Sequence, residues 1–353
     1  MSTYSDASRT EDTANGTTDE TILEITDLEK HYVKSAGWIQ SLFTDDKRVR
    51  AVDGISLSID KGEIFSVVGE SGCGKTTLGK TLLRINEPTG GSIRFKGKDL
   101  ATLSRSEMQQ LRQQMQIVYQ DPFEALNPKR TIYGLLKQPL EIHGINTPSE
   151  QRARIEQALT DVNLLPVNDF LDRYPEELSG GQLQRVLFAR ALVLNPEFIV
   201  ADEPSSMLDA SVRARVLDLI DELRHERNIS FFIITHDIGA ARYLSDRIGV
   251  MYLGRIVEMG DADHLIDDPK HPYSRALIES IPSPDPTEPL ETAGIGSEVP
   301  EPVDLPSGCR FHPRCPLATE HCKSVGPEWR TVPSEDETTR WTECHEVEPV
   351  HRP

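Results

Sequence analysis

Two kinds of hydrophobic pattern alternate along the chain. In residues Ile22 to Leu28 and Val49 to Ile59, apolar residues alternate with polar ones. This pattern is typical of strands buried on one face. Residues 64–68, 198–201 and 231–234 are continuous apolar runs, which are typical of parallel strands covered on both faces. The two patterns together predict an α/β protein with a buried parallel sheet and a separate half-buried one.

Shorter segments complete the expected elements. Further strands are predicted over residues 92–97 and 116–120, and a hairpin is predicted to join 247–251 to 255–259 at Leu253-Gly254. Apolar residues at helical spacing predict helices over residues 77–84, 105–114, 148–164 and 210–224, and a helix opening at Ser179-Gly180-Gly181. From residue 121 to about 194 the pattern is mainly helical.

Changes in composition divide the chain. Residues 1–20 are polar and acidic, without the layout of a secretory signal, so we interpret them as a disordered tail and expect a cytoplasmic protein. Residues 21–280 carry the α/β pattern, with an irregular insertion at 35–50. Prolines crowd residues 281–307, which is typical of a semi-rigid linker, and we expect residues 308–353 to form a small, irregular, cysteine-rich extension.

Charge and hydropathy narrow the possible partners. The net charge is -19, from 57 acidic and 38 basic residues, so phosphate would repel most of the surface. This argues against general nucleic-acid binding and against adsorption to anionic lipid. The acid excess suits a cytoplasm rich in salt, which we hold as a hypothesis. No apolar run approaches 18 residues, so we expect no membrane span.

The richest motif is Gly-Glu-Ser-Gly-Cys-Gly-Lys-Thr at residues 69–76, which fits the P-loop pattern. It follows an apolar strand and precedes a helix, as a phosphate-binding loop requires. Its glycines allow a tight turn whose N–H groups, with the following helix N-terminus, bind phosphate oxygens. We expect Lys75 to reach the β- and γ-phosphates and the Thr76 hydroxyl to bind Mg²⁺.

Further polar residues follow predicted strands. Asp202 and Glu203 end an apolar strand, where Asp202 could hold Mg²⁺ through water and Glu203 could polarise an attacking water. Gln120 and His236 each follow a strand. Leu-Ser-Gly-Gly-Gln at residues 178–182 opens a helix, which is another anion-binding arrangement.

This set of motifs resembles the ATP-binding subunit of an ABC transporter, over roughly residues 22–280. The resemblance implies a P-loop NTPase fold of ABC type, with an antiparallel β-subdomain and a helical subdomain near residues 121–194. It also implies ATP hydrolysis with Mg²⁺ in a head-to-tail dimer. Each ATP would lie between one subunit's P-loop and the other's Leu-Ser-Gly-Gly-Gln motif.

The resemblance implies a role for each matching residue. Tyr32 would stack on adenine, Asp202 would hold Mg²⁺ with Thr76 and Gln120, and Glu203 would be the catalytic carboxylate, with His236 and Lys75 at the γ-phosphate. The phosphate cradle would be Gly69, Ser71, Gly72, Gly74, Lys75, Thr76 and Thr77. The groups that reach the other subunit's γ-phosphate would be Ser179, Gly180, Gly181 and Gln182. Asp209 would couple the two sites, although Met207 replaces the usual small residue of its loop.

Local features narrow the resemblance to the oligopeptide/dipeptide branch of importers. They are the insertion at 35–50, Tyr-Gln-Asp-Pro-Phe at 119–123, His-Pro-Tyr-Ser at 271–274 and the stretch 308–318. The chain is most similar to the second ATPase subunit of that branch. This implies a heterodimer with a related ATPase, two membrane permeases and an extracytoplasmic binding protein, with the chain at the cytoplasmic membrane face. Some members carry oligosaccharides or nickel, so the cargo stays open.

Four of the five cysteines, Cys309, Cys315, Cys322 and Cys344, lie near the chain end and suggest a metal site. Their spacing lacks the paired C-x2-C pattern of many zinc sites. Four thiolates can hold a [4Fe–4S] cluster, and members of the branch with this pattern bind one, so we favour the cluster. Zinc, or free or occasionally oxidised thiols, are the alternatives, and the neighbouring histidines are interpreted as bystanders.

Two other kinds of protein compete with the transport interpretation. ABC ATPases of DNA repair or of ribosomes usually carry two cassettes or a long coiled coil, and this chain has neither feature. A degenerate subunit that binds ATP without hydrolysis would lack catalytic residues. Here Lys75, Asp202, Glu203 and His236 are all present.

Overall fold

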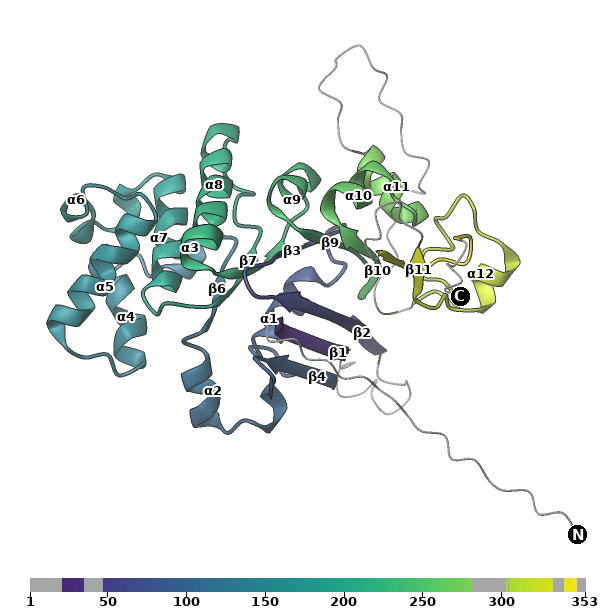
Figure 1. The fold of residues 1–353 in the computed structure, drawn as a ribbon, viewed down its shortest axis with the longest axis horizontal. Coiled ribbons are helices and arrows are strands. Elements are labelled where there is room, and N and C mark those ends of the chain that lie inside the picture. The colour runs from purple at the N-terminus through teal and green to yellow at the C-terminus, as the bar shows by residue number, and fades with distance from the viewer. Residues whose placement is uncertain (1–20, 35–46, 281–302, 304, 333–339, 348–353) are drawn as a thin grey trace, which may run out of the picture.

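The computed structural model describes residues 21–34, 47–280, 303, 305–332 and 340–347. The predicted acidic tail, most of the 35–50 insertion and most of the proline-rich linker lie outside these residues. Figure 1 shows a central sheet, with a group of helices at one end and the cysteine-rich region at the other. A smaller sheet lies beside the central one.

The central sheet has the order β11-β12-β10-β9-β3-β8-β7-β6. Five neighbouring strands of this sheet are parallel, and the predicted strands are confirmed. Their bounds are β6 (Met115–Val118), β7 (Phe198–Asp202), β8 (Ser230–Ile234), β3 (Ile64–Val68) and β9 (Arg247–Tyr252).

Two cores explain why these strands are apolar at every position. Phe231 and Ile233 of β8 belong to a core shared with the helices, whereas Phe232 and Ile234 belong to a core shared with the small sheet. Successive side chains of a strand point to opposite faces, so a strand with a core on each face needs no polar positions.

The small sheet is antiparallel, as expected, in the order β2-β1-β4-β5. Tyr32 pairs with Val49 in its first hairpin. The bounds are β1 (Thr21–Lys34), β2 (Lys47–Asp60), β4 (Gly90–Phe95) and β5 (Lys98–Asp99). Residues 47–50, which we assigned to the irregular insertion, belong to β2.

Most helices connect strands of the central sheet along the chain. Five of them, α3 to α7, connect β6 to β7, where the mainly helical pattern was expected, and Figure 1 shows them with α8 at one end of the molecule. The bounds are α1 (Lys75–Leu82), α2 (Arg105–Leu111), α3 (Pro122–Ala125), α4 (Ile132–Ile142), α5 (Pro148–Asp161), α6 (Asn168–Leu171), α7 (Gly180–Leu192), α8 (Ala210–Arg227), α9 (Ile238–Leu244), α10 (Ala262–Asp267), α11 (Pro272–Glu279) and α12 (Glu320–Ser324).

The predicted hairpin joins β9 to β10 (Arg255–Asp261) through Leu253 and Gly254. These two residues have φ angles of 43° and 83°. Positive φ at both central positions is the requirement of the tight hairpin turn that matches strand twist.

The expectation of an irregular cysteine-rich extension is wrong for part of it. Its strand β12 (Arg340–Thr342) pairs with β10, and β11 (Arg330–Val332) pairs with β12, so the extension continues the central sheet. Arg340 and Glu258 form an ion pair of 3.2 Å whose side chains are 3% and 1% exposed. Strands of three residues are too short to give a clear sequence pattern. Their conformation depends on the strands with which they pair.

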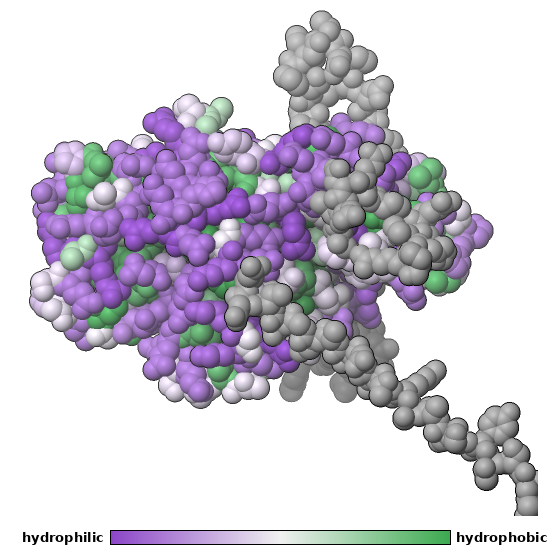
Figure 2. Space-filling view, viewed as in Figure 1, coloured by the Kyte–Doolittle hydropathy of each residue, from purple (hydrophilic) through white to green (hydrophobic). Residues whose placement is uncertain are grey.

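The face of the molecule seen in Figure 2 is mainly polar where it is coloured. Figure 2 shows hydrophilic side chains over most of this face, with apolar ones scattered among them. No helix in the described part of the chain is long and apolar enough to cross a membrane.

Candidate functional site

The P-loop connects β3 to α1 in a conformation that only glycine accommodates at its last turn. Gly74 has a φ of 112°, and a Cβ there would lie 2.0 Å from the Ala51 carbonyl oxygen. Lys75 is buried, and its ammonium group donates to the carbonyl oxygens of Gly69 (2.7 Å) and Glu70 (2.9 Å). The lysine charge is thus held inside the loop.

The end of β7 meets the start of α1. The Thr76 hydroxyl donates to Asp202 Oδ1 over 3.1 Å. Burial raises the pKa of Asp202, as does the charge of Glu203, while the Thr76 hydrogen bond acts against both. A hydroxyl and a carboxylate side by side are oxygen donors of the kind that Mg²⁺ prefers, so this pair fits a magnesium ion.

Three consecutive strand ends converge on Glu203. The Gln120 amide donates to Glu203 Oε2 over 3.0 Å, and His236 Nδ1 lies 3.2 Å from the same oxygen. Glu203 has a φ of 46°, and its N–H donates to the Ile234 carbonyl of β8. Residues that follow β6, β7 and β8 therefore form one polar cluster, and its backbone is held in an uncommon conformation.

These groups border a cavity of about 660 Å³. The structure brings together the predicted residues from β1, the P-loop and the three strand ends. The lining is Tyr32, Val49, Ala51, Ser71, Gly72, Gly74, Lys75, Thr76, Thr77, Gln120, Glu203 and His236. An adjoining cavity of about 410 Å³ is lined in part by Thr76, Gln120 and Asp202.

The Leu-Ser-Gly-Gly-Gln motif does not line this cavity. Ser179 is the N-cap of α7, and its hydroxyl accepts the N–H of Gln182, whose side chain accepts the Ser179 N–H. Gly181 packs on α8, where a Cβ would lie 2.3 Å from Val212 Cγ1. The motif is therefore a structured helix start placed apart from the P-loop of the same chain.

Asp209 has a comparable capping role at α8. Its carboxylate accepts the N–H groups of Ser211 and Val212 and the Ser211 hydroxyl. The Ser211 hydrogen bond, followed by these backbone N–H groups, lowers the pKa of Asp209. Met207 of the same loop is 59% exposed, so the substitution noted in the sequence places no bulk in the core.

Several residues at the site were not predicted. Val49 and Ala51 line the cavity because β2 pairs with the strand that carries Tyr32. Tyr273 and Arg314 bind the P-loop residue Glu70 from distant parts of the chain. Alternation along β2 could have suggested the first two, but no sequence pattern indicates the contacts of the others.

The four cysteines of the extension lie in one neighbourhood without forming a metal site. The Cys309 N–H donates to the Cys322 carbonyl over 2.8 Å. Burial raises the pKa of Cys309 to about 11, with contributions from Cys344, Cys322 and Cys315. Among the described residues, no group of three or more His, Cys, Asp or Glu could hold a metal ion. The expected cluster, and the zinc alternative, have no support in this arrangement.

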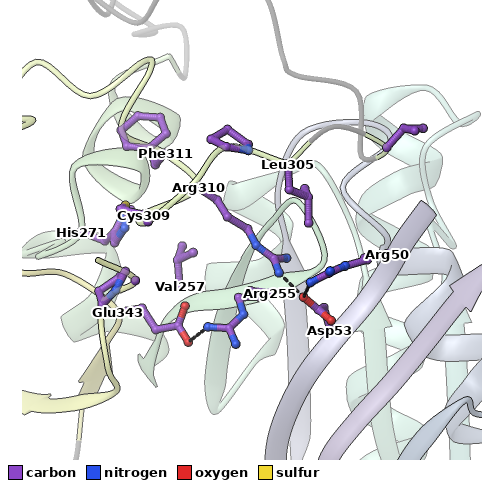
Figure 3. A pocket seen from close by; sticks show the side chains of 15 residues that line it. Arg50, Asp53, Arg255, Val257, His271, Leu305, Cys309, Arg310, Phe311 and Glu343 are labelled. Carbon is purple, nitrogen blue, oxygen red and sulfur yellow. Dashed lines mark hydrogen bonds and ion pairs between the residues drawn. The ribbon is translucent and has the colours of Figure 1, made fainter. Parts of the chain in front are cut away.

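Another cavity, of about 600 Å³, lies where the extension meets both sheets. Figure 3 shows its charged groups paired across the space, Arg310 with Asp53 and Arg255 with Glu343. The extension is thus attached to β2 and β10 by ion pairs as well as by strand pairing.

The P-loop, the carboxylates at the end of β7 and the separate Leu-Ser-Gly-Gly-Gln helix define an ATPase of the ABC class. Residues 52–206 match the family described as ABC transporter, and residues 257–322 match the oligopeptide/dipeptide transporter C-terminal region. The chain belongs to the ATP-binding proteins of the oligopeptide/dipeptide ABC transporter family.

Curated relatives and solved structures agree with this assignment. The chain is 43% identical over 92% of its length to the oligopeptide transport ATP-binding protein AppF of Bacillus subtilis, covering 97% of that protein. It is 42% identical over 93% of its length to the di/tripeptide transport ATP-binding protein DppF of Pseudomonas aeruginosa, covering 98% of it.

Among structures, the chain is similar to a dimeric post-hydrolysis state of the ATP-binding cassette MJ0796 bound to ADP and Pi. The TM-score is 0.59 at 28% identity, over 68% of this chain and 99% of that one. It is similar to cbiO1 of Clostridium perfringens with the same TM-score and identity, over 70% of this chain and 92% of that one.

Proposed function

We propose that this chain energises the import of dipeptides or oligopeptides, with oligosaccharide or nickel import as the alternative. The observation that carries the proposal is the cavity beside the P-loop, in a chain that also matches the C-terminal region of oligopeptide/dipeptide transporters. AppF and DppF, whose sequences align with more than nine-tenths of this chain, are both named for peptide transport.

The residues around the cavity would divide the work of hydrolysis. Tyr32 would stack on adenine, and the P-loop N–H groups with Lys75 would bind the phosphates. Bound Mg²⁺, held by Thr76 and Asp202 and sensed by Gln120, would neutralise charge on the β- and γ-phosphates. Glu203 would orient and polarise the attacking water.

His236 lies beside Glu203 and would contact the γ-phosphate. The gain in rate would come mainly from orientation and electrostatics, since phosphoryl transfer requires little covalent chemistry from the protein.

A partner subunit would complete the site. Ser179, Gly180, Gly181 and Gln182 lie apart from the P-loop cavity of their own chain, so they are free to serve the nucleotide of a facing subunit. We expect that subunit to be a related ATPase, and the dimeric solved structure of MJ0796 supports a paired arrangement. Asp209 would couple the two sites.

Coupling to membrane subunits would occur beside Gln120. A cavity of about 270 Å³ is lined by residues of β6, α4 and α7 and of the segments that follow α1 and α2, including the exposed side chains of Ile85, Tyr119 and Ile142. A short permease helix would fit such an apolar depression. The chain would then lie at the cytoplasmic face of the membrane, with two permeases and an extracytoplasmic binding protein completing the importer.

The chain would divide into a tail at residues 1–20 and three further parts. Residues 21–280 would form the ATP-binding domain, with its helical subdomain near 121–194, followed by a linker at 281–307 and the cysteine-rich region at 308–353.

The iron–sulfur assignment also stays a proposal, based on ligand chemistry. Four thiolates are the ligand set of a [4Fe–4S] cluster, and binding would have to draw the four cysteines closer together. Protein purified without oxygen should contain about four irons and four labile sulfides per chain. Colourless protein that contains zinc and no iron would favour the zinc alternative, and metal-free protein would leave free thiols.

Reconstitution tests the transport proposal. The full chain, its partner ATPase, the permeases and the binding protein are placed in lipid vesicles, and uptake of labelled peptides, oligosaccharides and Ni²⁺ is measured with ATP. We expect ATP-dependent peptide uptake, abolished by Lys75→Ala. Uptake of sugar or nickel alone would select the alternative, and failure to assemble with permeases would refute a transport role.

A further inference from the structure

A residue of the cysteine-rich extension binds the P-loop directly. Arg314 donates from both terminal nitrogens to the two carboxylate oxygens of Glu70, over 2.7 and 2.8 Å. Glu70 is the second residue of the P-loop motif. The Arg314 side chain is 7% exposed and that of Glu70 is 27% exposed, so solvent screens this bidentate pair only partly.

The loop that carries Arg314 is held firmly against the domain. The N–H of Arg314 donates to the Phe311 carbonyl over 3.0 Å, which closes a tight turn. Phe311 is 1% exposed, and its ring centroid lies 5.4 Å from those of Tyr252 and Tyr273. The guanidinium of Arg314 lies over the Tyr252 ring, 5.7 Å from its centroid. This packing on aromatic rings holds the Arg314 guanidinium in the position from which it reaches Glu70.

Glu70 in turn contacts the phosphate-binding lysine. Its backbone N–H donates to the Tyr273 hydroxyl over 3.0 Å, and its carbonyl accepts from the Lys75 ammonium over 2.9 Å. A chain of contacts therefore runs from Arg314 through Glu70 to Lys75. It joins the extension to the residue expected at the β- and γ-phosphates.

We propose that Arg314 is a positioning residue for ATP binding, which neutralises the Glu70 carboxylate and holds it away from the nucleotide phosphates. The proposal deepens the ATP site described above and depends on it. Without Arg314 an unpaired negative charge would stand in the P-loop, beside a ligand that is itself strongly negative. In a partly screened setting, such repulsion is enough to weaken binding about tenfold.

Titration of the full chain with a fluorescent ATP analogue and Mg²⁺ tests this. Arg314→Gln should raise the Kd about tenfold, whereas the double variant Arg314→Gln with Glu70→Gln should return it to within about threefold of wild type, because the unpaired charge is gone. Arg330→Gln is the matched control. Among the contacts described, the Arg330 side chain bonds only to the carbonyls of His345 and Val347, which both belong to the extension. This control should leave the Kd unchanged.

Two results would overturn the proposal. One is an unchanged Kd for Arg314→Gln, and the other is a double variant that binds as weakly as the single one, which indicates a merely structural role. If Arg314→Gln does not fold, Glu70→Gln alone removes the carboxylate that Arg314 neutralises; its Kd should stay within about threefold of wild type or fall, and a tenfold rise would overturn the proposal. Wild-type protein that binds no ATP would instead refute the proposed ATP site.

Discussion

Individual residues at the ends of three strands would carry the proposed chemistry of this protein. Gln120 and His236 both contact one oxygen of Glu203, so side chains of the same chain orient this carboxylate. A carboxylate held in this way can orient a water for in-line attack without further reorganisation. The roles assigned to these residues lead to a direct test.

Glu203→Gln should keep ATP binding within about threefold of wild type while turnover falls about 100-fold or more, because a general base contributes at least that much. With its partner ATPase, the variant should accumulate a closed dimer that retains ATP. Turnover and size-exclusion chromatography measure the two effects. Glu226→Gln, an exposed acid on α8, is the control, and unchanged turnover in Glu203→Gln would remove the assigned role.

His271 gives a second test at this scale. It is fully buried at the start of α11, where its Nδ1 accepts the Tyr273 N–H over 3.0 Å, and burial lowers its pKa to about 3. Between pH 3 and 6.5 the unfolded chain therefore binds the extra proton, so stability is lost as the pH falls below about 6.5.

His271→Asn keeps a capping acceptor but does not titrate. Between about pH 6.5 and 5, wild type should lose about 1–2 kcal/mol more unfolding free energy than the variant does. Urea unfolding at each pH measures the difference. Parallel pH profiles of the two proteins would show that His271 does not contribute.

At the scale of elements, the start of α7 depends on glycine and on capping side chains. Ser179 precedes α7 as the N-cap of a reciprocal cap, and Gly181 in the first turn lies against Val212 of α8. Gly180, one residue earlier, has only Leu208 nearby, at 3.8 Å from the position of a Cβ. The two adjacent glycines thus have different structural requirements.

Gly181→Ala should lower the free energy of unfolding by about 1–3 kcal/mol, because the added methyl would lie 2.3 Å from Val212 Cγ1 and must separate the helices. Gly180→Ala is the matched control and should be neutral or slightly stabilising, since alanine favours helix more than glycine does. Urea unfolding of both variants makes the comparison. Equal effects of the two substitutions would contradict the packing argument.

The whole molecule is governed by its charge and by the attachment of its C-terminal extension. A net charge of -19 makes the compact state repel itself, and counter-ions reduce that repulsion. The extension continues the central sheet through β12 and contacts the P-loop through Arg314. The ATP site and the cysteine-rich region are thus physically continuous.

The thermal midpoint of unfolding should rise by at least about 3 °C between dilute buffer and about 1 M KCl, as screening relieves repulsion in the folded state. Potassium chloride is preferred to sulfate, which also strengthens hydrophobic burial. Calorimetry on the full chain measures the shift. A midpoint that stays constant or falls would reject the high-salt hypothesis.

Much of the fold could be predicted because its signals are local. Continuous apolar runs predicted β3, β7 and β8, and the turn residues Leu253 and Gly254 predicted the β9–β10 hairpin. The short strands β11 and β12 and the helices α9, α10 and α11 were not predicted. Each of them is too short for hydrophobic periodicity to stand out, and their conformation depends on the surfaces that they cover.

The sequence by itself determined the chemistry of the site, because a P-loop and strand-end carboxylates have fixed local spacing. It also identified the family, through motifs whose order along the chain is specific. Only the tertiary structure decided that Arg314 and Tyr273 bind Glu70, and that the extension joins the central sheet. The two contacts of Glu70 join residues more than 200 positions apart, and their geometry arises only when the intervening chain has folded.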